Sequence, residues 1–184
     1  MKWMLVLSAA AFLGGCGGGD SGSQCGEQMV LDEQSLDVVE VRLYRGRCLG
    51  HLVIRPQGDD AKSRLVAIAQ TLAAAIPADG SAPASDAQLV TLVPDPGQVG
   101  DGTWQEDLTD QVEGPWLVST SAYDWIDGAG KPFEDNGFQA ASGETYQHQA
   151  PDLRLTIELV DQGSCAGAEA AFRDAGWNEG TPVE

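Results

Sequence analysis

The sequence is poor in basic residues and in histidine. Its 184 residues include 10 Lys and Arg against 28 Asp and Glu, which gives a formal net charge of −18 at pH 7. Nucleic-acid binding needs cationic patches that neutralise phosphates, and anionic lipid head groups attract clusters of Lys and Arg. The composition therefore argues against a nucleic-acid partner and against electrostatic docking on a membrane, and it favours an acidic, well-solvated surface.

The sequence also lacks the motifs that identify common active sites. It contains no G-x-S-x-G nucleophile elbow, no H-E-x-x-H zinc motif and no P-loop. His51 and His148 are the only histidines; His51 alternates onto the strand face opposite Leu52, and His148 lies in a polar stretch. The sequence therefore assigns no catalytic residue, and it favours a non-catalytic protein over an enzyme.

No membrane-spanning run occurs near the N-terminus. The apolar stretch there covers residues 4–13 and follows Lys2, whereas a spanning helix needs about 20 apolar residues. One basic residue followed by a short apolar segment is typical of an export signal. The sequence therefore predicts export, and a membrane anchor has to come from another source.

The residues after this stretch resemble the signal of a bacterial lipoprotein. Leu13-Gly14-Gly15-Cys16 matches the lipobox, which is Leu, two small residues and Cys. The resemblance implies cleavage before Cys16, acylation of Cys16, and a lipid-anchored position in the cell envelope. Gly17 after the lipidated Cys implies sorting to the outer membrane of a Gram-negative cell, with the domain facing the periplasm or the cell surface.

The chain is accordingly divided into three parts. Residues 1–15 are the expected signal peptide, residues 16–36 the lipidated Cys and a flexible tether, and residues 37–184 a single globular domain. The Gly- and Ser-rich residues after Cys16 favour flexible coil. The remaining length suits one ordinary domain with its own core.

Three cysteines remain once Cys16 is set aside. An exported protein meets oxidising conditions, so one disulfide bond is expected among Cys25, Cys48 and Cys165. We favour Cys48–Cys165, because a hairpin turn and the end of a later strand would bring them together at one sheet edge; Cys25 is the alternative partner. Zinc is disfavoured because no C-x-x-C pair occurs.

The spacing of apolar residues predicts an α+β fold. We expect an antiparallel or mixed sheet with two or three helices packed on one face. The last helix should begin at the N-cap Ser164 and end at Gly176, with Trp177 contacting Phe172. Alternating or short apolar runs predict strands, and a period of 3.6 predicts helices; the strands are expected at 37–45, 48–56, 87–93, 116–123 and 152–160, and the helices at 59–76, 103–112 and 164–175.

The candidate binding residues are acidic or aromatic. Calcium takes six to eight oxygen ligands, which Asp124, Asp127, Glu134 and Asp135 could provide, although their spacing departs from the EF-hand and equally suits a solvated Gly-rich turn. No other cofactor is expected. Exposed aromatics can stack on sugar rings or line an interface, while buried ones serve the core; the candidates are Trp104, Trp116, Tyr123 and Trp125.

Three functions stay open. The favoured one is a lipid-anchored binding or protein-interaction module of the cell envelope, which needs no catalytic residues and contacts the membrane through its lipid. The alternatives are a structural envelope protein without a small ligand, and a hydrolase of cell-wall or extracellular material that works with paired carboxylates. A partner protein of the envelope is compatible with the first.

Overall fold

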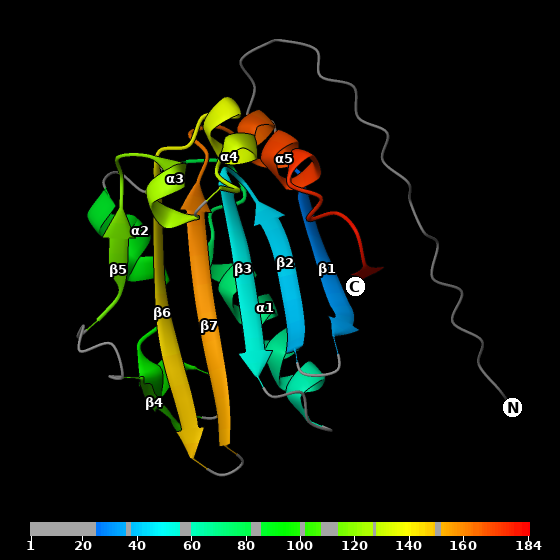
Figure 1. Ribbon diagram of the computed structural model, residues 1–184, viewed down its shortest axis with the longest axis vertical. Helices are drawn as coiled ribbons and strands as arrows, with labels where there is room; N and C mark the ends of the chain where they lie inside the picture. Colours follow the sequence, from blue (N-terminus) through cyan, green and yellow to red (C-terminus); the bar gives the residue numbers. More distant parts are fainter. Residues whose placement is uncertain are drawn as a thin grey trace, which may run out of the picture.

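One antiparallel β-sheet forms the centre of the molecule. The structure, a computed structural model, describes residues 25–35, 38–55, 60–81, 86–99, 102–107, 114–126, 128–149 and 152–184. The sheet has eight strands in the order β4-β6-β7-β3-β2-β1-β8, and β5 also pairs with β6 (Figure 1). The strands are β1 (Glu27–Ser35), β2 (Val38–Arg45), β3 (Cys48–Arg55), β4 (Trp104–Glu106), β5 (Trp116–Val118), β6 (Ala140–Gln149), β7 (Asp152–Asp161) and β8 (Thr181–Pro182).

Helices cover both faces of this sheet. On one face lie α1 (Ala61–Ala75), α2 (Asp86–Leu92) and the short 3-10 helix η1 (Pro96–Gln98). At one end of the other face lie α3 (Ala122–Trp125), α4 (Lys131–Asp135) and α5 (Cys165–Asp174) (Figure 1). The α+β prediction is confirmed, but the described residues contain five α-helices instead of two or three, and these use both faces instead of one.

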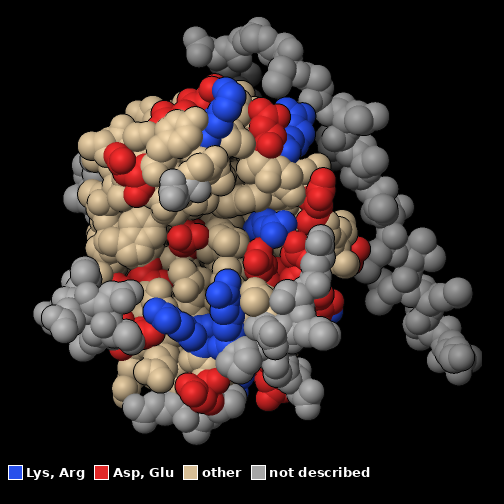
Figure 2. Space-filling view, viewed as in Figure 1, with Lys and Arg blue, Asp and Glu red and all other residues tan. Residues whose placement is uncertain are grey.

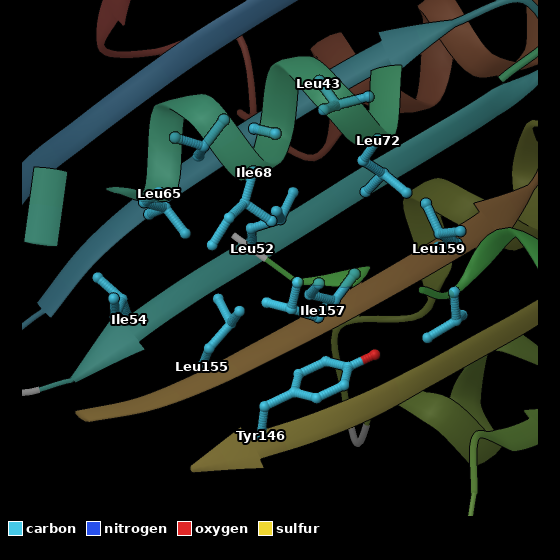
Figure 3. Close-up of a cluster of buried hydrophobic side chains, with 14 of the residues drawn as sticks. Leu43, Leu52, Ile54, Leu65, Ile68, Leu72, Tyr146, Leu155, Ile157 and Leu159 are labelled. Atoms are coloured by element: carbon cyan, nitrogen blue, oxygen red, sulfur yellow. The ribbon is translucent and has the colours of Figure 1, made fainter. Parts of the chain in front are cut away.

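Alternation along the strands separates two cores. On β7, Leu155, Ile157 and Leu159 point toward α1 and α2, where they meet Leu65 and Ile68 (Figure 3). Val160 points to the opposite face and packs with Phe172 of α5. Each fully buried Leu, Ile or Phe side chain stabilises the fold by about 1.5–3 kcal/mol, so both helical layers are held by apolar burial.

The part of the second face that α3, α4 and α5 leave uncovered is polar. Its central strands carry charged side chains, among them Glu40 and Arg42 on β2 and Glu158 on β7. Basic and acidic side chains lie side by side over this region (Figure 2). Among the described helices, none spans a membrane, because no helix has the required combination of length and apolar character.

The strand prediction for residues 87–93 is wrong, because this segment forms α2. The buried Leu89 lies four positions before the buried Val93, which directly follows α2, and this spacing places both on one side of a helix. A short apolar run bounded by turns fits a buried strand as well as a helix. The tertiary position over β6 and β7 decides between them.

The helix prediction for residues 103–112 is also wrong for those of these residues that the structure describes. Residues 104–106 form β4, where Trp104 stands opposite His148 of β6; residues 108–113 lie outside the described residues. The strand predicted at 116–123 is shorter, because Ser121 accepts a hydrogen bond from the Tyr123 amide at 3.2 Å and caps α3.

Strand β1 lies inside the range that was assigned to the tether. Its residues Glu27–Ser35 pair with β2 from Glu27↔Arg45 to Ser35↔Val38. The described fold therefore starts at Cys25 and not at residue 37. The signal of β1 was weak because Val30 and Leu31, which are neighbours, are both buried, so the strand does not alternate between apolar and polar residues.

The predicted disulfide Cys48–Cys165 is wrong. Cys165 is bonded to Cys25, and Cys48 is a buried free thiol. Cys48 belongs to the core beneath α1, whereas Cys165 begins α5 on the opposite face of the sheet. Burial raises the pKa of the Cys48 thiol to about 12, so this thiol stays protonated at neutral pH.

The end of α5 matches its prediction. Ser164 accepts a hydrogen bond from the Gly167 amide at 3.0 Å and caps the first turn. At the other end, the Trp177 amide donates to the Phe172 carbonyl and the Gly176 amide to the Arg173 carbonyl, both at 2.9 Å. This is a Schellman motif, and Gly176 supplies the positive φ of 71° that it requires.

Candidate binding groove

Helix α1 has a flank of mostly small side chains beside its buried stripe. Leu65, Ile68 and Leu72 point toward the sheet (Figure 3). Next to them around the helix come Ala67 and Thr71, which are exposed. Small and apolar residues on this flank leave room between α1 and the segment that follows α2.

Two adjoining cavities occupy that room. One has a volume of about 320 Å³ and lies between α1 and the end of α2. The other has a volume of about 380 Å³ and runs toward Trp104. Both are lined by Ile68, Thr71 and Gln98, so they are neighbouring parts of one depression along α1. We call this depression the α1 groove; its other described lining residues are Ser63, Arg64, Ala67, Leu72, Ala75, Thr91, Leu92, Pro94, Val99 and Trp104.

The polar side chains of the α1 groove are engaged within the chain. The Thr71 hydroxyl donates to the Ala67 carbonyl at 3.0 Å, and the Thr91 hydroxyl donates to the Gln88 carbonyl at 2.8 Å. The Gln98 side-chain oxygen accepts from the Asp95 amide at 3.0 Å. Since the two hydroxyls donate to their own helices, a ligand here meets mainly methyl and methylene groups.

The groove is elongated, and one of its described lining residues is charged. Its α1 wall extends from Ser63 to Ala75, which corresponds to about 18 Å at 1.5 Å per residue. Arg64, at one end, is the one charged side chain among the described lining residues. Ligand sites of a few hundred Å³ with apolar walls and few polar groups are the usual form of small-molecule pockets.

A further cavity lies between the edge of the sheet and α1. It has a volume of about 380 Å³, and its lining includes Met29, Leu43, Arg45 and Val183. The Arg45 guanidinium pairs with Glu27 at 2.9 Å, while its buried Nε has no hydrogen-bond partner among the described residues. Glu27 and Glu184 also line this cavity, so its walls are more strongly charged than those of the α1 groove.

An ionic network crosses the polar half of the opposite sheet face. The Nδ1 and Nε2 atoms of His51 lie 2.9 Å from Glu158 and 3.3 Å from Glu40. Arg42 pairs with Glu40 at 2.7 Å and with Asp32 at 3.1 Å. Cross-strand register explains the arrangement, because His51 stands opposite both Arg42 and Glu158.

The network fixes the charge of its members. Burial of His51 disfavours its charged form, but the hydrogen bonds and charges of Glu158 and Glu40 outweigh burial and raise the imidazole pKa. The hydrogen bond from His51 is the main cause that lowers the pKa of Glu40 to about 2; burial opposes this shift and Arg42 reinforces it. The raised pKa favours the imidazolium, which can donate from both ring nitrogens to the two carboxylates, so this cluster has the character of a structural ion network.

The aromatic candidates lie on different faces of the sheet. Trp104 is buried, lines the α1 groove and makes a T-shaped contact with His148 at 5.1 Å between ring centroids. On the other face, Trp116 packs where Gly143 has no Cβ, and the Trp125 indole donates to Glu158 at 3.1 Å. Tyr123 is 49% exposed. The structure thus brings one of these four residues to the groove.

The predicted calcium ligands contact protein groups in the structure. Glu134 accepts hydrogen bonds from the Ser121 hydroxyl and the Ala122 amide, and Asp135 pairs with Lys131. Asp124 accepts from the Thr120 hydroxyl. Asp127 lies outside the described residues. Within the described ranges, no three His, Cys, Asp or Glu side chains gather as metal ligands.

Comparison of the chain with protein-family profiles, with characterised protein sequences and with solved structures gave no significant match.

Sequence reasoning missed most of the groove. The helical period located the buried stripe of α1, but Arg64 and Thr71 lie on its flank and carry no motif. The opposite wall begins at Thr91 and Leu92 of α2, in a segment for which the sequence predicts a strand. The sequence marks Trp104 as an aromatic candidate but does not indicate which face of the sheet it occupies.

Proposed function

We propose that this protein is a lipid-anchored binding module of the cell envelope, and that it binds an apolar ligand in the α1 groove. The observation that carries the proposal is the groove itself, with apolar walls, internally bonded hydroxyl groups and two joined cavities of about 320 and 380 Å³. Burial of apolar ligand surface supplies about 25 cal/mol per Å², which is the driving force available to such a site.

The envelope location is supported by two independent features. The first is the lipobox at Leu13–Cys16, with residues 1–15 as the signal peptide. The second is the Cys25–Cys165 bond, because disulfides persist in exported proteins and are rare in the reducing cytosol. An outer-membrane position, facing the periplasm or the surface, follows if the host is Gram-negative.

A structural role and a hydrolase are less well supported. A structural protein has no need for a hollow of this size. A hydrolase with paired carboxylates needs one acid with a raised pKa in the site. Burial raises the pKa of Glu144, but Glu144 does not line any of the three cavities.

Binding in the groove can be tested with N-phenyl-1-naphthylamine, a neutral apolar dye whose fluorescence increases out of water. We expect the dye to bind the unmodified protein at one equivalent. Thr71→Trp, which places an indole in the groove, should abolish this binding. Ala74→Trp is the matched control, because Ala74 is exposed on the same helix and lines none of the three cavities.

The binding proposal fails if the dye does not bind, or if Ala74→Trp removes binding as completely as Thr71→Trp does. Far-ultraviolet circular dichroism and the melting temperature of both variants show whether each has retained the fold.

The anchor can be tested by replacing Cys16. Cys16→Ser in the full precursor should move the protein from the membrane fraction to the soluble fraction and should abolish labelling by radioactive palmitate, because stable anchoring by acyl chains needs at least two of them. Cys48→Ala serves as the control and should leave both readouts unchanged. Membrane association of the Cys16→Ser variant at the unmodified level would contradict the anchor.

A further inference from the structure

We propose that a proton on His51 holds α3 and α4 against the sheet, and that loss of this proton as the pH rises loosens these two helices. His51 belongs to β3, between β2 and β7, and its side chain lies on the face that carries α3, α4 and α5 (Figure 1). The α1 groove lies on the opposite face, so this inference does not depend on the proposed binding function.

A closed ring of five side chains joins the sheet to the helices on this face. The Nδ1 atom of His51 lies 2.9 Å from one carboxylate oxygen of Glu158, and the other oxygen accepts a hydrogen bond from the Trp125 indole at 3.1 Å. The centroid of the Trp125 ring lies 4.9 Å from that of Phe133, which in turn lies 5.2 Å from that of Trp177. The Trp177 ring then closes on the His51 ring at 5.3 Å. The proton on His51 is therefore part of the contact that docks α3 and α4.

The geometry around His51 fits its protonated form. Its Nδ1 faces Glu158 at 2.9 Å and its Nε2 faces Glu40 at 3.3 Å. An imidazolium donates from both nitrogens, whereas a neutral imidazole has one donor and one acceptor. Whichever nitrogen loses its proton, a lone pair then points at a carboxylate. Neutral His51 can therefore not keep both contacts.

The charge balance of the surrounding network favours the same form. The described network contains three carboxylates, and its cations are Arg42 and protonated His51; the carboxylates are Asp32, Glu40 and Glu158. Loss of the proton leaves Arg42 as the cation that balances all three. Like charges at short range repel, so the contact between Glu158 and the helices weakens when His51 becomes neutral.

The helices contribute aromatic rings to this contact. Trp125, Phe133 and Trp177 do not titrate. The charged side chains of these helices have other partners in the described structure: Asp124 accepts from Thr120, Glu134 accepts from Ser121, Asp135 pairs with Lys131, and Glu169 pairs with Arg173. Within the described chain, Glu158 and Glu40 are thus the groups that set the charge of His51.

Helices α3 and α4 depend on this ring because they are short. They have four and five residues, and helices of this length are not stable on their own in water. Glu134 of α4 accepts hydrogen bonds from the Ser121 hydroxyl and the Ala122 amide of α3, so the two helices move as one unit. Helix α5 has ten residues and is fixed at Cys165 by the disulfide. We therefore expect loosening of α3 and α4 with α5 in place.

The direction of the effect follows from the same contacts. Burial disfavours the charged form of His51, but the hydrogen bonds and charges of Glu158 and Glu40 outweigh burial, so its pKa lies above the ordinary value of 6.5. A raised pKa contributes stability that is complete below the unfolded value and is lost as the pH rises through the folded value. The helices are therefore docked at about pH 6 and loosen on the alkaline side of 6.5.

The first test follows the tryptophans of the protein after labelling with 5-fluorotryptophan. Their fluorine resonances are recorded between pH 5.5 and pH 9. We expect Trp125 and Trp177 to change with one shared midpoint above pH 6.5, because both belong to the ring. His51→Gln should abolish this transition. His148→Gln is the matched control, because His148 lies on the other face of the sheet beside Trp104, and it should leave the transition unchanged.

The second test measures loosening directly by cleavage with chymotrypsin, which accepts aromatic residues. Cleavage after Trp125 and Phe133 requires local opening, and its rate follows the population of the open form. Rates at pH 6 and pH 8.5 are normalised to those of a disordered peptide, which corrects for the pH dependence of the protease. We expect at least a fivefold increase at these two sites in the unmodified protein.

Glu40→Gln separates loosening of the helices from simple titration of His51. The amide at position 40 can donate to the lone pair on Nε2, so neutral His51 keeps both of its contacts. Cleavage of this variant should not increase between pH 6 and pH 8.5. Glu33→Gln, which removes an exposed carboxylate paired with Lys62, should behave like the unmodified protein. Far-ultraviolet circular dichroism shows whether each variant has retained the fold.

Three results would overturn the proposal. The first is a transition of Trp125 and Trp177 at different pH values, or one that persists in His51→Gln. The second is a constant rate of cleavage while the two resonances titrate, because His51 would then lose its proton without loosening the helices. The third is an increase in cleavage of Glu40→Gln equal to that of the unmodified protein. If His51→Gln does not fold, the unmodified protein and Glu40→Gln still decide the question.

Discussion

Loss of the Cys25–Cys165 bond should lower the free energy of unfolding by about 5 kcal/mol, according to the chain-entropy relation for a loop closed over a sequence separation of 140 residues. The bond ties Cys25, two residues before β1, to the first residue of α5, so it closes almost the whole described fold into one loop. The measurement is urea unfolding of the oxidised protein and of the Cys25→Ser/Cys165→Ser variant.

Cys48 provides the control for this prediction. Cys48→Ala removes a buried thiol from the core beneath α1 but leaves the bond intact. This variant should still lose stability when dithiothreitol is added, whereas the double serine variant should not respond to it. A response to dithiothreitol that disappears in Cys48→Ala would assign the bond to Cys48 and contradict the structure.

Glu40→Gln should remove up to about 3 kcal/mol of stability at pH 6 and almost none at pH 2. The folded-state pKa of Glu40 is about 2 instead of 4.5, and each pKa unit corresponds to about 1.4 kcal/mol. Since Glu40 is partly exposed, solvent screening makes this value an upper bound. A depressed pKa contributes stability above the unfolded value, and that stability is lost as the pH falls from about 4.5 through about 2.

The variant is suited to this test because it leaves the other charges paired. His51 keeps Glu158, and Arg42 keeps Asp32. His51 also stays protonated between pH 2 and pH 6, because its pKa is raised. The stability that the protonated His51 contributes to the fold is lost only at higher pH.

Glu33→Gln is the matched control for Glu40→Gln. Glu33 is an exposed carboxylate that pairs with Lys62 at 3.0 Å on the protein surface. Exposed pairs contribute about 0–1 kcal/mol, so the pH profile of this variant should follow that of the unmodified protein. A gap between unmodified protein and Glu40→Gln that stays constant from pH 6 to pH 2 would show that Glu40 is not held ionised by the network.

The central part of the fold could be predicted from the sequence because its signals are local. The β2–β3 hairpin, β7, α1 and α5 each show a clear period of 2 or 3.6, and Ser164 and Gly176 mark the ends of α5 in the expected positions. These elements contain the strands in the middle of the sheet and the two longest helices, so the α+β class followed from them.

The remaining elements depend on contacts that no local pattern records. Leu89 and Val93 suit a strand or a helix equally well until β6 and β7 are placed beneath them. The pairing of the cysteines depends on which face of the sheet each of them occupies. To predict it, one needs the register of β3 and the side of the sheet on which α5 lies. The α1 groove could not be predicted for the same reason. Its two walls come from segments that are separated along the chain and are brought together only by packing on the sheet.

The position of Cys25 has a mechanical consequence. A force applied to the chain ahead of Cys25 reaches the covalent bond to Cys165 before it reaches the hydrogen bonds of β1. The load then passes into α5 and its buried residues Ala168, Ala171 and Phe172, and β1 is not peeled from the edge of the sheet one residue at a time. A domain held at its N-terminus by an anchor can therefore take up tension through this disulfide and the packed core beneath α5.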